Sequence, residues 1–172
     1  MNAIKKNNLI NAVLFQALWF SAVYGSANKL LWPSVISLII LGVWQLNTNR
    51  RATSDYILIL VALIIGVIID SFWIQMGIIE YFDKRPIIWL SPMWILILWA
   101  GFALTINHSM AWMKKHPLIP ILCGLISAPL SYYAGQRLGA MTYKQDVLVV
   151  SAYIGLAWAV ALPLLVKVSQ KN

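Results

Sequence analysis

Long apolar segments alternate with short polar connectors along the whole 172-residue chain. A helix that spans a membrane needs about 20 apolar residues, and each of the six segments reaches or approaches that length. The pattern predicts an all-α integral membrane bundle in a single domain, residues 1–172. The expected transmembrane helices are 9–25, 30–46, 56–79, 87–113, 118–136 and 146–167.

Composition supports a protein surrounded by lipid. Hydrophobic residues make up 61% of the chain and charged residues 10%, whereas soluble domains carry about 25% charged residues. The formal net charge of +8 would raise the question of nucleic acid in a soluble protein. Here the basic residues form short clusters between apolar segments, so we assign them to membrane orientation and anionic lipid. We expect membrane lipids as partners and no nucleic acid.

The distribution of Lys and Arg predicts the orientation. With the N-terminus in the cytoplasm, eight basic residues fall inside and five outside. The inner set is Lys5, Lys6, Arg50, Arg51, Lys114, Lys115, Lys167 and Lys171, and the outer set is Lys29, Lys84, Arg85, Arg137 and Lys144. The positive-inside rule therefore favours both termini in the cytoplasm of a bacterial-type inner membrane.

The N-terminal segment also has features of a cleaved signal peptide. Lys5 and Lys6 precede an apolar stretch that ends in the small residues "GSA". Asn11 and Gln16 interrupt that stretch, which argues for a retained first helix.

Several kinds of chemistry are excluded by what the sequence lacks. Cys123 is the only cysteine, so an intrachain disulfide, a CxxC redox pair and a cysteine-rich metal site are ruled out. His108 and His116 are the only histidines and form no HxxxH pattern. No nucleotide-binding loop, GxSxG or HExxH motif is present. We therefore expect no cofactor and no metal, and whether the protein is an enzyme stays open.

Asp70 is the only acid well inside an apolar segment. A carboxylate at this depth costs at least ~2.5–3.5 kcal/mol, so such residues usually face a bundle interior, a water cavity or a partner. Helical spacing places Gly66, Asp70, Trp73 and Gly77 on one stripe, where the glycines would admit a neighbouring backbone. Asp70 either pairs with Arg137 and stays charged, or is neutral with a proton available for transfer. A carboxyl that only fixes helix packing is the alternative.

Aromatic and polar residues of other segments map to the same outer half of the bundle. Trp94 and Trp99 lie deep enough that their indole N–H groups need partners. The predicted outer pocket gives the candidate ligand-binding set Asp70, Trp73, Ser91, Trp94, Tyr132, Tyr133 and Arg137. Interface-belt residues and a snorkelling surface arginine are the simpler interpretations of some of these residues.

Two further groups have mainly structural interpretations. Asn11, Asn107 and His108 map to the inner half and form a secondary candidate set, although bonds between helices or contacts at the membrane interface would explain them. The fifth segment carries a small-residue face suited to close helix packing. That face consists of Gly124, Ala128, Ser131 and Gly135.

Three stretches together resemble a bacterial family of small polytopic membrane proteins whose domain has no assigned function. They are "NAVLFQALWFSAVYGSA", "PMWILILWAGFALTINHSMAWM" and "APLSYYAGQRLGA". Members of that family are often encoded beside cyclopropane-fatty-acid-synthase-like methyltransferases, so the resemblance implies a role related to lipids. The tryptophan-rich translocator family is a poorer match, because the six segments and the missing proline-rich first loop argue against it.

Three functional hypotheses follow from these observations. The leading one is a membrane protein that binds or translocates a lipid-like or other apolar small molecule. The second is an intramembrane enzyme of lipid modification with Asp70 as acid or base. The third is a structural or regulatory subunit that joins a membrane-protein partner or another copy of itself.

Overall fold

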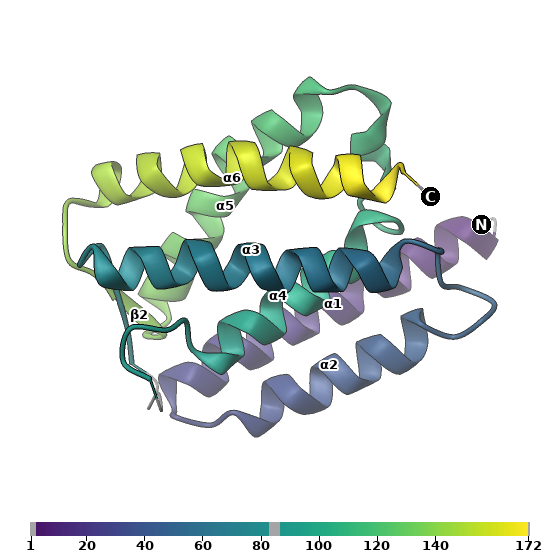
Figure 1. Cartoon of the computed structure of the whole chain (residues 1–172). Helices are drawn as coiled ribbons and strands as arrows, with labels where there is room; N and C mark the ends of the chain where they lie inside the picture. The colour runs from purple at the N-terminus through teal and green to yellow at the C-terminus, as the bar shows by residue number, and fades with distance from the viewer. Residues whose placement is uncertain (1–2, 83–86, 172) are drawn as a thin grey trace.

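The computed structural model describes residues 3–82 and 87–171 and shows six antiparallel helices (Figure 1). These are α1 (Ala3–Ala27), α2 (Trp32–Gln45), α3 (Asp55–Gln75), α4 (Met93–Ile106), α5 (Leu118–Arg137) and α6 (Val147–Ser169). The predicted all-α bundle is confirmed. Four helices, α1, α3, α5 and α6, are long and apolar enough to cross a membrane, while α2 and α4 are shorter. Lys84 and Arg85, counted above for the outer side, lie outside the described residues.

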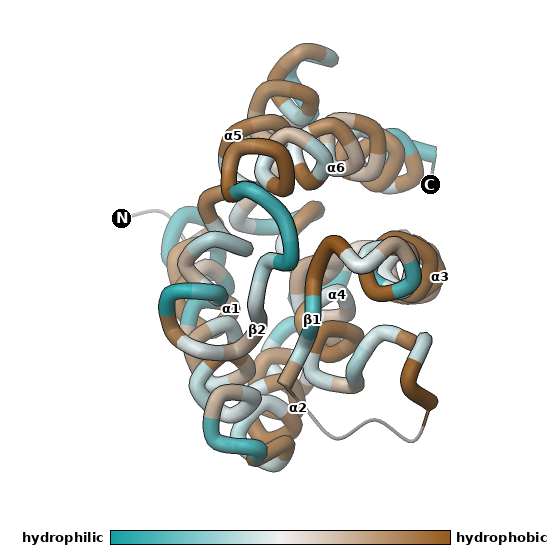
Figure 2. Tube along the Cα trace, turned by 90° about the vertical axis from the view of Figure 1, so that its left-hand side faces the viewer, coloured by the Kyte–Doolittle hydropathy of each residue, from teal (hydrophilic) through white to brown (hydrophobic). Residues whose placement is uncertain are grey.

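The central helix of the bundle is α4. It packs against α1, α2, α3 and α6, and α5 packs mainly along α6. Seen along the bundle, α1 and α3 lie on opposite sides of α4, with α5 and α6 together at one edge (Figure 2). The start of α1 and the end of α6 lie at the same end of the bundle (Figure 1).

Two short strands close the opposite end of the bundle. Strand β1 (Ile79–Tyr81) follows α3, β2 (Met141–Tyr143) follows α5, and the two pair antiparallel with Ile79 opposite Tyr143. Gly77 and Gly139, with φ of 62° and 83°, end the two helices in the left-handed conformation that glycine adopts at little cost. The N–H groups of the residues after them bond back to the carbonyls of Trp73 and Gly135, at 2.9 and 3.0 Å.

The structure corrects the end of the third predicted segment. The helix ends at Gln75 instead of continuing to residue 79, and the strands were not predicted. Gly77 does not admit a neighbouring backbone, because among the described residues no atom other than those of its chain neighbours lies within 4 Å of the position where its Cβ would be. Gly66 does allow close approach, since a Cβ there would lie less than 3.0 Å from the Trp99 ring.

The fourth predicted segment, 87–113, is also divided. It consists of α4 and, after a turn, the 3-10 helix η1 (Ala111–Lys115). The Thr105 carbonyl accepts hydrogen bonds from the N–H groups of both His108 and Met110, at 3.0 and 2.9 Å, which reverses the chain there. Polar residues 107–109 lie at this turn, but apolar residues continue on both sides of it, and the predicted segment therefore ran on to residue 113.

Candidate functional site

The Asp70 carboxyl group is the hub of a buried hydrogen-bond network. Its Oδ1 accepts hydrogen bonds from the hydroxyls of Tyr81 and Tyr132, at 2.6 and 2.7 Å. Its Oδ2 accepts one from Trp99 Nε1 at 2.7 Å. The four side chains come from α3, β1, α5 and α4, and Asp70 is 0% exposed. One carboxyl group therefore connects four elements that are distant in the sequence.

Of the two alternatives for Asp70, the pairing with Arg137 is not found. Arg137 is exposed, and the contacts between acidic and basic side chains within the described ranges are His108 with Asp55 and Lys144 with Glu80. Arg137 follows Tyr132 by five residues on α5, so the two side chains point in different directions around the helix. Tyrosine and tryptophan donors are the hydrogen-bond partners of Asp70.

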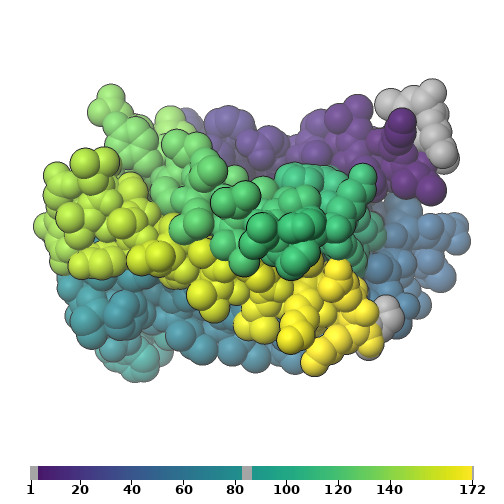
Figure 3. All heavy atoms as spheres, turned by 90° about the horizontal axis from the view of Figure 1, so that it is seen from above, coloured from purple at the N-terminus to yellow at the C-terminus, as the bar shows by residue number. Residues whose placement is uncertain are grey.

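A cavity of about 680 Å³ lies beside this network, and we call it the α1–α5 cavity. It is bounded by α1, α4, α5 and α6, with η1 near one end. Seen from above, η1 and the beginning of α5 lie between α6 and α1 (Figure 3). Its lining side chains are mainly aromatic, aliphatic or small, and none of them carries a charge.

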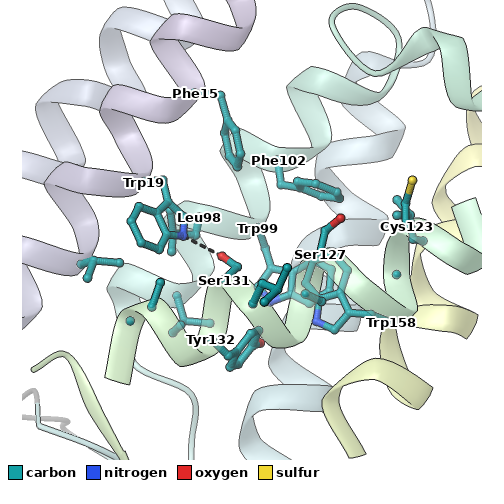
Figure 4. A pocket seen from close by; sticks show the side chains of 18 of the residues that line it. Phe15, Trp19, Leu98, Trp99, Phe102, Cys123, Ser127, Ser131, Tyr132 and Trp158 are labelled. Atoms are coloured by element: carbon teal, nitrogen blue, oxygen red, sulfur yellow. Dashed lines mark hydrogen bonds between the residues drawn. The ribbon is translucent and has the colours of Figure 1, made fainter. Parts of the chain in front are cut away.

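Aromatic rings form one wall of this cavity (Figure 4). The rings of Phe15 and Phe102 have centroids 5.9 Å apart, and Phe102 meets Trp158 edge-on at 5.2 Å. Trp158 stacks on Trp99 at 4.5 Å with an interplanar angle of 13°. The small residues of α5, among them Ser131, also line the cavity.

The Asp70 network shares two side chains with the lining of the cavity. Trp99 and Tyr132 line the cavity and also donate to the carboxyl group, so Asp70 holds two wall side chains in place. Across the cavity, Trp19 Nε1 donates to Ser131 Oγ at 2.9 Å and links α1 to α5. Neither link was predicted from the sequence.

The remaining primary candidates occupy different places. Trp94 lines the cavity, is 1% exposed and packs its ring edge-on against Tyr81. Trp73 and Ser91 are buried nearby, and the Ser91 N–H donates to Ser71 Oγ at 3.0 Å.

Two primary candidates do not line the α1–α5 cavity. Tyr133 is 39% exposed and lines a shallow groove with Pro129 and Val147. Arg137 lies at the exposed end of α5. The structure therefore brings together Asp70, Tyr132 and Trp94 and separates the other two residues from them.

The inner-half candidates form separate polar contacts at the end of the bundle where α6 finishes. Asn11 is buried, and its amide nitrogen donates to Gln45 Oε1 at 2.8 Å and to the Leu104 carbonyl at 3.0 Å. These bonds join α1 to α2 and α4, as the structural interpretation of Asn11 predicts.

Asn107 and His108 contact Asp55, which the sequence analysis missed. Asn107 donates to Asp55 Oδ1 at 2.7 Å, and His108 Nε2 lies 2.9 Å from Oδ2. Lys114 Nζ donates to Asn107 Oδ1 at 2.6 Å. Burial lowers the pKa of the Lys114 ammonium group, and attraction to Asp55 partly opposes that shift. Asp55 is the first residue of α3, and acidic residues are common at the start of a helix. Its burial could therefore not be predicted from the sequence.

Comparison with known proteins places the chain in a family. Residues 8–164 match the family described as "Protein of unknown function (DUF2878)". The chain belongs to this family. No curated protein and no solved structure matches it. The family therefore adds no activity or ligand, and the chemistry of the site has to be argued from the α1–α5 cavity itself.

Proposed function

We propose that this chain is a small membrane protein that binds a lipid-like or other apolar small molecule in the α1–α5 cavity. The size and the uncharged lining of the cavity are the main evidence for this proposal. Its volume of about 680 Å³ lies within the range of about 300–1,000 Å³ typical of small-molecule sites. The bacterial inner membrane, with both termini in the cytoplasm, is the location that we propose.

The position of the cavity favours entry of the ligand from the bilayer. Its lining includes Gln16 on α1 and Ser127 and Leu130 on α5, all of which are exposed. Both helices are long and apolar enough to cross a membrane, so the surface between them would face lipid. A ligand dissolved in the bilayer could then enter sideways without crossing water.

Asp70 is suited to hold side chains of the cavity lining in position and is not suited to act as a general acid or base. The carboxyl group is 0% exposed, and both of its oxygens already accept hydrogen bonds. A general acid or base has to come within hydrogen-bond distance of its substrate. We therefore assign Asp70 a positioning role for the Trp99 and Tyr132 side chains that line the cavity.

The proposal is tested by filling the cavity from α5. Ser127→Trp places a large side chain on the cavity lining, and Ala152→Trp, on an exposed part of α6 outside the lining, is the matched control. Each protein is purified in mild detergent, and native mass spectrometry with lipid extraction measures the retained small molecules. Wild type and Ala152→Trp should retain a bound apolar molecule that Ser127→Trp loses.

Circular dichroism and thermal unfolding establish that the variants are folded. Equal retention by folded Ser127→Trp and wild type would refute the proposed site. A wild-type protein that retains no apolar molecule and binds none added in vitro would refute the proposed function. In that case, co-purification of a stoichiometric membrane-protein subunit would favour the regulatory alternative.

A further inference from the structure

We infer that the ligand of the α1–α5 cavity is a lipid with a flat, uncharged, conjugated ring that bears a hydrogen-bonding oxygen. This inference rests on the proposed function and specifies the class of ligand. It follows from the aromatic rings that line the cavity, from the small residues of α5 and from the hydroxyl groups that two of those small residues carry.

The aromatic wall favours a ring over a flexible chain. Phe15, Phe102, Trp158 and Trp99 follow one another with centroid separations of 4.5 to 5.9 Å. Aromatic pairs gain stability from offset-stacked and edge-to-face contacts beyond the area that they bury. A conjugated ring placed beside Phe15 and Phe102 would extend this series, whereas a saturated chain would gain only the burial of its surface.

A stripe of small residues on α5 also lines the cavity. Ser127 and Ser131 belong to this stripe and lie on one face of the helix, while the larger Leu130 and Tyr132 of α5 line the cavity on either side of it. Gly124 leaves no space beside it, because a Cβ there would meet the α6 backbone. A space between aromatic rings and this narrow stripe is suited to a planar group.

Hydroxyl groups provide the polar contact. The Ser127 hydroxyl has no hydrogen-bond partner in the part of the chain that the structure describes, and Figure 4 shows it directed into the same space as Phe102. Ser131 Oγ accepts from Trp19, so its own proton is left to donate. The two serines lie one helical turn apart and can bond a carbonyl or hydroxyl oxygen of a ligand.

The uncharged lining excludes a ligand whose phosphate or carboxylate group enters the cavity. A phosphate or carboxylate group inside the cavity would have no cation among the lining residues to pair with. Transfer of an unpaired charge into such surroundings is strongly unfavourable. The group that enters the cavity is therefore neutral.

The test compares two neutral probes that both carry oxygen. One is a naphthoquinone with a short isoprenoid tail, and the other is monoolein, which has hydroxyl groups and a flexible chain. Native mass spectrometry titrations of the wild-type protein in detergent measure both dissociation constants. We expect the naphthoquinone to bind about tenfold more tightly, which corresponds to about 1.4 kcal/mol.

Phe102→Leu separates the ring contact from general burial. It should remove most of the preference for the naphthoquinone and leave monoolein affinity within about twofold. Phe72→Leu is the control, since Phe72 of α3 is exposed and lies outside the cavity lining. Thermal unfolding shows whether each variant is folded.

The possible outcomes distinguish the inference from the proposed function. Equal affinities, or tighter binding of monoolein, with loss of binding in Ser127→Trp would overturn the ring preference and leave the proposed function standing. Binding of neither probe, or binding unaffected by Ser127→Trp, would overturn both. Preference for the naphthoquinone that Phe102→Leu removes and Phe72→Leu retains would support both.

Discussion

Replacement of Gly66 by alanine should damage the Asp70 network without changing any of its members. Gly66 lies on α3, one turn before Asp70, and the added methyl group would lie less than 3.0 Å from the Trp99 ring. The indole would have to move, and its 2.7 Å bond to Asp70 Oδ2 would break or lengthen. Stacking of Trp99 on Trp158 would change with it, so the cavity wall would lose its support as well.

The magnitude follows from two costs and one gain. Overpacking typically costs about 1–3 kcal/mol, and leaving the buried Trp99 donor without a partner costs about 1–3 kcal/mol. Alanine is favoured over glycine inside a helix by roughly 0.5–1 kcal/mol. We expect Gly66→Ala to lower the free energy of unfolding by about 1–5 kcal/mol, and each kcal/mol lowers Tm by roughly 2–4 °C in a chain of this size.

Thermal unfolding in detergent, followed by tryptophan fluorescence, measures this effect. Gly42→Ala is the matched control, because among the described residues no atom outside the backbone of α2 itself lies within 4 Å of the position where that Cβ would be. The control should equal wild type or exceed it slightly, since only the helix preference for alanine acts there. A Gly66→Ala protein as stable as Gly42→Ala would refute the packing of Trp99 on Gly66 and the magnitude derived from it.

Three other predictions concern the polar residues and the orientation. Asp70→Asn should lower the free energy of unfolding by about 1.5–3 kcal/mol or more, because the amide group cannot accept hydrogen bonds from all three donors. Adding Arg137→Gln to this variant should not restore stability. Restored stability would indicate that Asp70 and Arg137 interact. Burial raises the pKa of the Tyr143 hydroxyl, so the folded state keeps that proton to higher pH than the unfolded state. Stability present below about pH 10 is then lost as the pH rises above it, and Tyr143→Phe should lessen that loss in urea or thermal unfolding; an unchanged alkaline dependence would contradict the assignment. In intact cells of a variant without the native cysteine, a membrane-impermeant thiol reagent should label Lys144→Cys and not Asn49→Cys, and the reverse pattern would overturn the orientation.

The six helices could be predicted because hydropathy depends on local composition. Each long apolar segment has to satisfy its backbone polar groups internally in lipid, and a helix does so without reference to other segments. The turn after Ile106 was missed because apolar residues continue beyond it. The paired strands were missed because they depend on capping glycines and on contacts between distant segments. Gly77 shows the difficulty, because a glycine on an apolar helical stripe has the same sequence context whether it admits a neighbour or ends the helix.

The candidate site was predictable only at its centre. Asp70 was identifiable because an isolated acid in an apolar segment needs a compensating partner. The identity of that partner depends on tertiary structure, and Tyr81 lies in a strand that the sequence did not reveal. Tyr132 and Tyr133 are adjacent, so they point about 100° apart on a helix, and only the packing of α5 determines that Tyr132 faces inward.

The short helices have a consequence for the surrounding membrane. At a rise of about 1.5 Å per residue, the 14 residues of α2 extend only about 21 Å, whereas the hydrocarbon core of a bilayer is about 30 Å thick. Large apolar side chains, among them Trp32, Ile39 and Val43, are exposed along this helix. Lipid beside α2 would have to thin locally, while the longer α1, α3, α5 and α6 match the full thickness elsewhere. The protein would thus impose an asymmetric hydrophobic mismatch on its annular lipids, with shorter or more disordered acyl chains favoured beside α2 than beside the other helices.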